Sequence, residues 1–128
     1  MLTDQMRDIL FLCKKKDMKE FFKEIGAAVT VSDVNGDIVY MNDKSAKTFE
    51  NYGGRELIGK SLFGCHPAPA ASKLKKMLLT HESNSYTIEK NGIRKIILQR
   101  PWFENSVFMG YVEFSFEIPA EMQHFVRK

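Results

Sequence analysis

The stretch VFMGYVEFSFEIP, from Val107 to Pro119, is the longest uninterrupted strand pattern in the chain. Apolar residues occupy every second position of its later part, and polar or amphipathic residues stand between them. The apolar set is Val112, Phe114, Phe116 and Ile118, and the other set is Tyr111, Glu113, Ser115 and Glu117. Successive side chains of a strand point to opposite faces, so the first set is predicted to face the core and the second to face water. A buried parallel strand would be apolar throughout, so the alternation predicts the central strand of an antiparallel sheet.

Length and composition are consistent with one folded domain. The chain has 128 residues, of which 44% are hydrophobic and ten are Phe, enough for a core of its own. Its formal net charge is only +3, and its basic residues are interleaved with acidic ones. A nucleic-acid-binding protein gathers basic residues on one face, so we expect no nucleic-acid partner. No run approaches the roughly 20 apolar residues that span a bilayer, so we expect no membrane segment.

The cysteines indicate the compartment. Cys13 and Cys65 form neither a disulfide framework nor a paired metal-binding motif, which favours a reduced, cytoplasmic location and no structural metal. The N-terminus does not resemble a signal peptide, because Asp4 and Asp8 stand where positive charge would be needed.

Residues 1–25 show a helical pattern with two apolar stripes on different sides. The first stripe contains Leu2, Met6, Ile9 and Cys13, and the second contains Phe21, Phe22 and Ile25. The spacing of the first stripe resembles a short coiled-coil seam, so we expect it to form a homodimer interface while the second packs on the domain. A break at the polar residues between the stripes, giving two short helices that both pack on the domain, is the alternative.

Residues 26–104 predict four strands and a set of small helices. A hairpin with Asn35-Gly36 at a type I′ turn is followed by Asn42 and Asp43, which can cap a helix. A longer helix is predicted to begin near Pro69, and a second hairpin has Asn91-Gly92 at its turn. Pro101 cannot donate a backbone hydrogen bond, so its end of the strand is predicted to be an edge or a bulge.

In combination these pieces resemble the PAS domain family from roughly Gly26 to Pro119. The matching segments are VSDVNGDIVYMN, NDKSAKTFE, GGRELIGKSL, the helix Ala70 to His81, and MGYVEFSFEI. The resemblance implies an α+β fold with a five-stranded antiparallel sheet, small helices on one face and a pocket between them. We therefore expect an N-terminal helix at 1–25, a PAS domain at 26–119 and a C-terminal tail at 120–128.

The resemblance also implies a function. Family members sense a small molecule, haem, flavin or light, or dimerise to control a linked effector. Since only residues 120–128 follow the last strand, we expect a cytoplasmic sensory or regulatory module that acts through a separate effector protein. We expect no enzymatic activity, because Cys65 and His66 are sequence neighbours without an identifiable oxyanion-stabilising group.

Eight residues are candidates for the pocket: Cys65, His66, Leu74, Met77, Leu78, His81, Phe114 and Phe116. His81 is expected on the pocket face of its helix, where haem-binding members of the family place their ligand; alternatively it is a cation near a helix C-terminus. His66 is a second candidate haem ligand, or a hydrogen-bonded loop residue. Cys65 lacks the Asn-Cys-Arg context of flavin-binding members, so flavin is not expected, and the cofactor stays open.

The alternative function is a ligand-free dimerisation domain. In that case Met77, Leu78, Phe114 and Phe116 would fill the interior. A cavity of about 300 Å³ or more would favour ligand binding, and a solidly packed interior would favour the interaction role.

Overall fold

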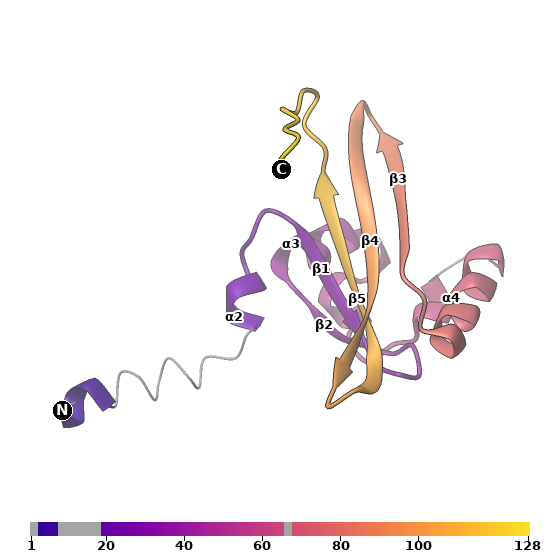
Figure 1. Ribbon diagram of the computed structural model, residues 1–128. Coiled ribbons are helices and arrows are strands. Elements are labelled where there is room, and N and C mark those ends of the chain that lie inside the picture. The colour runs from indigo at the N-terminus through magenta and orange to yellow at the C-terminus, as the bar shows by residue number, and fades with distance from the viewer. Residues whose placement is uncertain (1–2, 8–18, 66–67) are drawn as a thin grey trace.

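The computed structural model describes residues 3–7, 19–65 and 68–128, and the sheet forms its centre (Figure 1). Five antiparallel strands lie in the order β2-β1-β5-β4-β3. Their bounds are β1 (Ala28–Ser32), β2 (Ile38–Met41), β3 (Asn84–Lys90), β4 (Ile93–Glu104) and β5 (Val107–Glu117). The prediction that the Val107–Pro119 stretch is the central strand is confirmed, because β5 lies third of the five.

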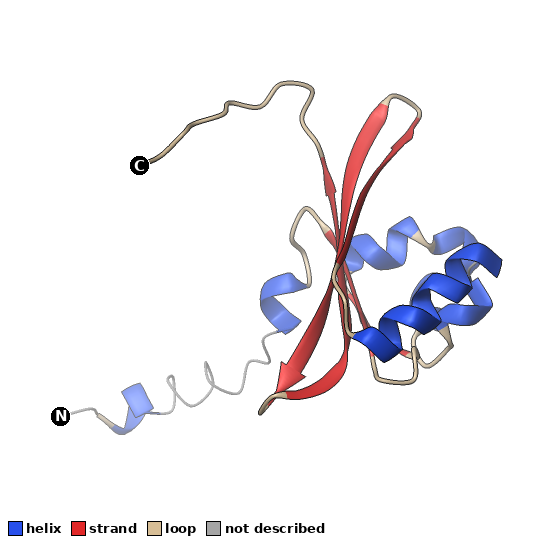
Figure 2. Cartoon of the chain, turned by 45° about the vertical axis from the view of Figure 1, so that its right-hand side comes forward, coloured by secondary structure: helices blue, strands red, loops and turns tan. Residues whose placement is uncertain are grey.

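The helices lie on both faces of the sheet, as the edge-on view shows (Figure 2). They are α2 (Lys19–Phe22), α3 (Asp43–Thr48) and α4 (Ala68–Thr80), with the 3₁₀ turns η1 (Glu50–Tyr52), η2 (Gly54–Leu57) and η3 (Leu62–Cys65). Helix α2 lies against one face, called here the outer face. The other helices and 3₁₀ turns cover the opposite, inner face.

The assignment of the two faces of β5 was wrong. Tyr111, predicted to face water, is 8% exposed and contacts helix α4, whereas Phe114 packs against Phe22 of α2 on the outer face. Phe116 stacks on Phe114 and is 39% exposed. Alternation tells which side chains share a face, but the more apolar face need not be the one that the chain's own helices cover.

The N-terminal helix differs from its prediction where it is described. Helix α2 ends at Phe22 rather than continuing to Ile25. Phe22 contacts the sheet with its ring centroid 6.4 Å from that of Phe114, while Phe21 is 67% exposed. Of the first stripe, Met6 is 48% exposed, and Leu2, Ile9 and Cys13 lie outside the described residues, so the dimer interface stays a prediction.

Of the two predicted type I′ turns, the one at Asn91-Gly92 is confirmed and the one at Asn35-Gly36 is wrong. Asn91 and Gly92 have positive φ values of 54° and 77°, as the predicted type I′ turn requires. Asn105 and Ser106 make a second left-handed pair between β4 and β5. In the first hairpin only Gly36 has positive φ, because the Asp33 carboxylate accepts hydrogen bonds from the backbone of Asn35 and Asp37 and holds a longer loop.

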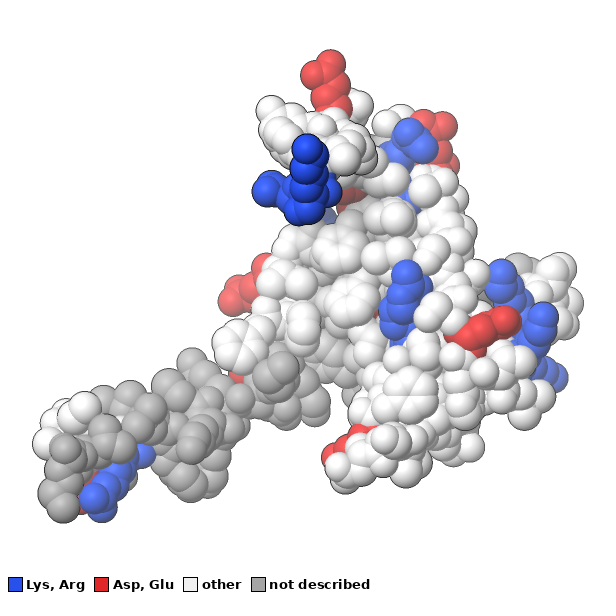
Figure 3. Space-filling view, in the orientation of Figure 1, with Lys and Arg blue, Asp and Glu red and all other residues white. Residues whose placement is uncertain are grey.

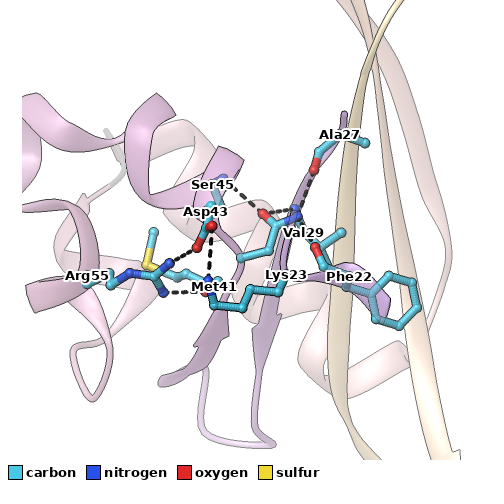
Figure 4. Close-up of polar contacts among 9 residues, drawn as sticks. Phe22, Lys23, Ala27, Val29, Met41, Asp43, Ser45 and Arg55 are labelled. Atoms are coloured by element: carbon cyan, nitrogen blue, oxygen red, sulfur yellow. Dashed lines mark hydrogen bonds and ion pairs between the residues drawn. The ribbon is translucent and has the colours of Figure 1, made fainter. Parts of the chain in front are cut away.

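The helix cap at Asn42 is confirmed and has a wider role. Its Oδ1 accepts hydrogen bonds from the backbone of Val29 and Ser45, and its Nδ2 donates to the carbonyl oxygens of Phe22 and Ala27 (Figure 4). The side chain is 0% exposed. One amide thus satisfies buried backbone groups of four other residues, and it joins α2, β1 and α3.

The strand end at Pro101 is irregular, as predicted. The pairing of β3 with β4 stops at Gln99, and the register of β4 against β5 shifts between Trp102 and Phe103. Opposite this shift lies Gly110, where a Cβ atom would be 1.9 Å from the carbonyl oxygen of Ser32. Gly110 thus allows β1 and β5 to approach closely.

Candidate ligand pocket

A cavity of about 70 Å³ lies between the inner face of the sheet and the helices. It is smaller than the 300 Å³ expected of a pocket for a drug-sized ligand, yet the interior is not packed solid. Its lining comes from the sheet and from the helical layer. The sheet contributes Thr30, Ser32, Ile38, Met41, Gln99, Tyr111 and Glu113, and the helical layer contributes Phe49, Leu57, Leu62, Phe63, Leu74, Met77 and Leu78.

The helical wall of the cavity is apolar. Leu74, Met77 and Leu78 are spaced three and four residues apart, so they share one face of α4 and point to the same side. Met77 is 1% exposed, while Leu79 on another face of the helix is 83% exposed. A ligand would therefore meet hydrocarbon on this side.

The sheet wall is polar, and the strand register explains why. Thr30 of β1 pairs with Glu113 of β5, Glu113 pairs with Gln99 of β4, and Gln99 pairs with Asn84 of β3. Paired residues point to the same face of a sheet, so these four side chains form one row across four strands.

Hydrogen bonds connect most of this polar row. Asn84 Nδ2 donates to Gln99 Oε1 over 2.8 Å, and Gln99 Nε2 donates to Glu113 Oε2 over 2.7 Å. An ionised carboxylate only accepts hydrogen bonds, so it fixes the amide orientation of Gln99 and, through it, that of Asn84. At the other end of the row, the hydroxyls of Thr30 and Ser45 share a hydrogen bond of 2.6 Å.

Ser32 is the exception to this satisfied network. Its side chain is 3% exposed, and its Oγ atom has no hydrogen-bond partner among the described residues. A buried polar atom without a partner costs about 1 to 3 kcal/mol, which favours water or a ligand group beside it. Ser32 lines the cavity and pairs with Tyr111 of β5.

Tyr111 connects the cavity to the end of α4. Its hydroxyl donates to the carbonyl oxygens of Met77 and Glu82, at 2.6 and 2.9 Å. Burial raises the pKa of Tyr111, and the nearby negative charge of Glu82 adds to the effect. The phenol is thus a neutral donor that holds the C-terminal end of α4 against the sheet.

The structure brings together only part of the predicted site. Leu74, Met77 and Leu78 line the cavity, whereas the predicted pocket positions of Phe114 and Phe116 are wrong, because both lie on the outer face. Cys65 is the last residue of η3, and His66 lies outside the described residues. Ligand roles for the residues at the cavity, and for Cys65 and His66, stay predictions.

The predicted pocket position of His81 is also wrong. His81 follows α4 with a positive φ of 59°, so its side chain leaves the helical stripe. The exposed imidazole stacks on the ring of Phe108, with centroids 3.8 Å apart, and meets Phe103 edge-on. The helical pattern failed here because helix geometry ends one residue earlier.

The sequence reasoning did not name the polar side of the cavity. Thr30 and Ser32 alternate with valines in β1, and Glu113 alternates with phenylalanines in β5. That alternation is the available signal, but from it Glu113 is predicted to face water, and Thr30 and Ser32 are assigned no face. Gln99 becomes part of the site only through the register of β4 with β5.

Comparison with known proteins identifies the fold. No protein-family model and no curated protein matches the sequence. Among solved structures, the PAS domain of an HTR-like protein from Haloarcula marismortui is similar over 89% of this chain and 99% of that one, at 14% identity and a TM-score of 0.62. The chain has a PAS fold.

Two further similar structures have descriptions that name a ligand or a function. The Aer2 receptor of Vibrio cholerae, described as a dual PAS-heme oxygen sensor, matches 72% of this chain and 94% of that one at 15% identity, with a TM-score of 0.55. VqmA bound to DPO matches 80% of this chain at 16% identity, with a TM-score of 0.60, and the match covers 57% of that chain. At these identities the likeness concerns the fold alone.

Two further observations concern metal-binding groups and membrane-spanning helices. In the described residues, no three His, Cys, Asp or Glu side chains gather as a metal-binding group. Within ranges 3–7, 19–65 and 68–128, no helix combines the length and hydrophobicity that crossing a membrane requires.

Proposed function

We propose that this protein is a sensory or regulatory module that binds a small molecule in the cavity between its sheet and α4. The unpartnered Oγ of Ser32 in a 70 Å³ cavity with one apolar wall carries the proposal. An interior selected only for packing would be filled, and it would not leave a buried hydroxyl unsatisfied. The neighbours with a PAS fold include a protein described as bound to DPO and one described as a heme oxygen sensor, which supports a sensory role.

The route of the signal is part of the same proposal. Tyr111 and Glu113 of β5 line the cavity, and the next residue of the strand, Phe114, contacts Phe22 of α2 on the outer face. Binding that shifts β5 can therefore bias the position of α2, and a separate effector protein would respond to that change. The low cysteine content supports a cytoplasmic setting.

A titration followed by amide NMR tests the binding function. Small apolar molecules added to the full chain are expected to shift the amide signals of Leu74, Met77 and Tyr111 in a saturable manner. A module without a ligand would show no saturable shift at these positions. An absorbance spectrum of freshly purified protein adds the chromophore test: a Soret band establishes haem, flavin bands establish flavin, and a blank spectrum excludes both as retained chromophores.

The outer face supports a second function, homodimerisation. Phe114 is paired with Val29 and Leu98, and Phe116 with Ile96, so apolar side chains are adjacent across three strands. Figure 3 shows this side of the molecule with large areas free of charged residues. A neighbour with a PAS fold, VqmA of Vibrio cholerae, is described as a dimer, which supports the same role here. Sedimentation analysis of the full chain tests it, because a monomer at all concentrations would exclude it.

A further inference from the structure

Glu113 is the only charged side chain among the described residues that line the cavity, and it has unused capacity to accept hydrogen bonds. Among the described side chains, the carboxylate of Glu113 accepts its hydrogen bond at Oε2, which leaves Oε1 available. The single hydrogen of the Tyr111 hydroxyl is committed to the carbonyl oxygens of Met77 and Glu82, so only its oxygen can still accept. The Ser32 hydroxyl can donate or accept and does neither in the described structure.

In residues 3–7, 19–65 and 68–128, Glu113 makes no ion pair. The ion pairs of the described residues involve other carboxylates, such as Glu117 with Lys44, and none involves Glu113. Glu113 is half-buried beside an apolar cavity, where hydrogen bonds to an ionised group are stronger than those between neutral groups. A hydrogen donor arriving from the cavity would meet a strong acceptor with no competing cation.

We propose that the pocket selects small apolar molecules that carry an N–H or O–H donor, held by Glu113 with Ser32 as the second polar contact. The proposal rests on the proposed function, since it names the ligand class of the same cavity. The apolar body of the ligand lies against Leu74, Met77 and Leu78. A molecule of the same shape that carries only acceptors faces the carboxylate and is rejected, because its lone pairs and the carboxylate repel each other.

Pyrrole and furan are suitable probes, because they are five-membered aromatic rings of similar shape. Pyrrole presents an N–H donor, whereas the ring oxygen of furan can only accept. A cavity of about 150 Å³ accommodates benzene, and five-membered rings are among the smallest aromatic probes for this smaller cavity. Amide NMR titration of the full chain with each probe gives the two dissociation constants. We expect pyrrole to bind about tenfold more tightly than furan, the usual effect of a hydrogen bond to a charged group.

Two variants test the assigned residues. In Glu113→Gln, the new side-chain oxygen must accept from Gln99 Nε2, which turns an amide N–H₂ donor toward the cavity. The preference should therefore disappear or reverse toward furan. Ser32→Ala removes an unpartnered hydroxyl, so the protein should stay folded. Pyrrole has one N–H and no acceptor, so its affinity should change little. Pyrazole, whose second ring nitrogen can accept a hydrogen bond from Ser32, should bind less tightly to this variant. Glu117→Gln is the matched control, because this glutamate lies on β5 outside the cavity lining and should leave the preference unchanged.

The outcomes separate this inference from the function on which it rests. Equal affinities for pyrrole and furan in the wild-type protein would overturn the selectivity while leaving a ligand-binding pocket. A preference for pyrrole that persists in Glu113→Gln, or an affinity for pyrazole that Ser32→Ala leaves unchanged, would overturn the assignment to these residues. Failure of both probes to bind would overturn the pocket function as well.

Discussion

Asn42 Nδ2 donates a 2.7 Å hydrogen bond to the carbonyl oxygen of Phe22. Asn42 caps α3 on the inner face of the sheet, whereas Phe22 belongs to α2 on the outer face. The same side chain accepts from the backbone of Ser45 at the start of α3. Helix α2 on the outer face and helix α3 on the inner face are thus held by one buried amide. This contact fixes α2 beside the domain in addition to the packing of Phe22 on Phe114.

Asn42→Asp should destabilise the protein by about 3 kcal/mol, because it removes both donors and buries a negative charge beside two carbonyl oxygens. Urea denaturation measures the free energy of unfolding. Asn51→Asp, at an exposed position in η1, is the control and should change the stability little. Equal stabilities of the two variants would show that the buried amide is not important for folding.

Gly110→Ala should prevent folding or cost about 3 kcal/mol or more, since the new Cβ would clash with the Ser32 carbonyl oxygen and φ is +139°. Gly26→Ala is the matched control, because nothing lies within 4 Å of a Cβ atom there. Thermal unfolding of both variants measures the difference. A Gly110→Ala variant as stable as the wild type would contradict the close approach of β1 and β5.

Tyr111→Phe should destabilise the fold by about 1 to 3 kcal/mol, because the carbonyl oxygens of Met77 and Glu82 lose the phenol as a donor. The Met77 oxygen keeps the backbone N–H of His81 as a donor. The effect should depend on pH. Burial raises the pKa of Tyr111, so the folded state retains this proton at a pH where the unfolded chain loses it. The contribution of the Tyr111 hydroxyl to the free energy of unfolding is therefore complete below about pH 10, the ordinary pKa of a phenol, and declines at higher pH.

The measurement for Tyr111 is urea denaturation between neutral and strongly alkaline pH. Tyr40 and Tyr86 also have raised pKa values, mainly from burial, so the wild type should lose stability at high pH for several reasons. The stability difference between wild type and Tyr111→Phe isolates the one residue and should shrink as the pH rises. Tyr52→Phe, at a position 69% exposed, is the control. A difference that stays constant with pH would exclude a role for the Tyr111 proton.

The double substitution Met6→Glu with Ile9→Glu should convert a homodimer into folded monomers, because it places charges in the predicted N-terminal seam. Sedimentation equilibrium gives the mass, and circular dichroism verifies the fold. Leu79→Glu, at a position 83% exposed on α4, is the control and should leave the dimer unchanged. A dimer that survives the double substitution but is lost in Phe116→Glu would move the interface to the outer face.

Pyrrole bound in the cavity should change the rate of amide exchange in residues 19–25 if β5 transmits the effect of binding to α2. The reason is that Phe114 of β5 contacts Phe22 of α2. Hydrogen-exchange mass spectrometry with saturating pyrrole measures this effect. Phe22→Ala removes the ring contact and should abolish the change in residues 19–25 while the response in α4 persists. Exchange in residues 19–25 that ignores pyrrole in the wild type would leave α2 as a simple cover of apolar surface.

The sequence predicted elements whose signals are local. The alternation of Val107–Pro119, the Asn91-Gly92 turn and the Asn42 cap each depend on a few neighbouring residues, and the structure agrees with them. Which face of β5 is covered depends instead on the side to which the distant helices pack. The two-residue alternation of the strand would be the same whichever face they covered. That is why Phe114 and Phe116 were placed in the pocket, although they lie outside it.

The polar side of the pocket could not be predicted for a related reason. Gln99 and Glu113 come together only through the register of β4 against β5, and no short stretch of sequence specifies that register. The error at His81 has a local cause. The helical pattern was extended to His81, one residue beyond the end of α4, where the backbone is no longer helical.

The strand order has a consequence for how the chain is made. The middle of the sheet joins its first and last strands, with Val29 of β1 paired to Phe114 of β5. The two hairpins, β1 with β2 and β3 with β4, need only local contacts, but nothing in the sheet joins them until β5 is present between them. A nascent chain on the ribosome can therefore form both hairpins early and complete the sheet only after β5 has emerged. Until then Val29 and Leu98 lack the strand that pairs with both, so the emerging chain exposes two unpaired edges that are sites for aggregation or chaperone binding.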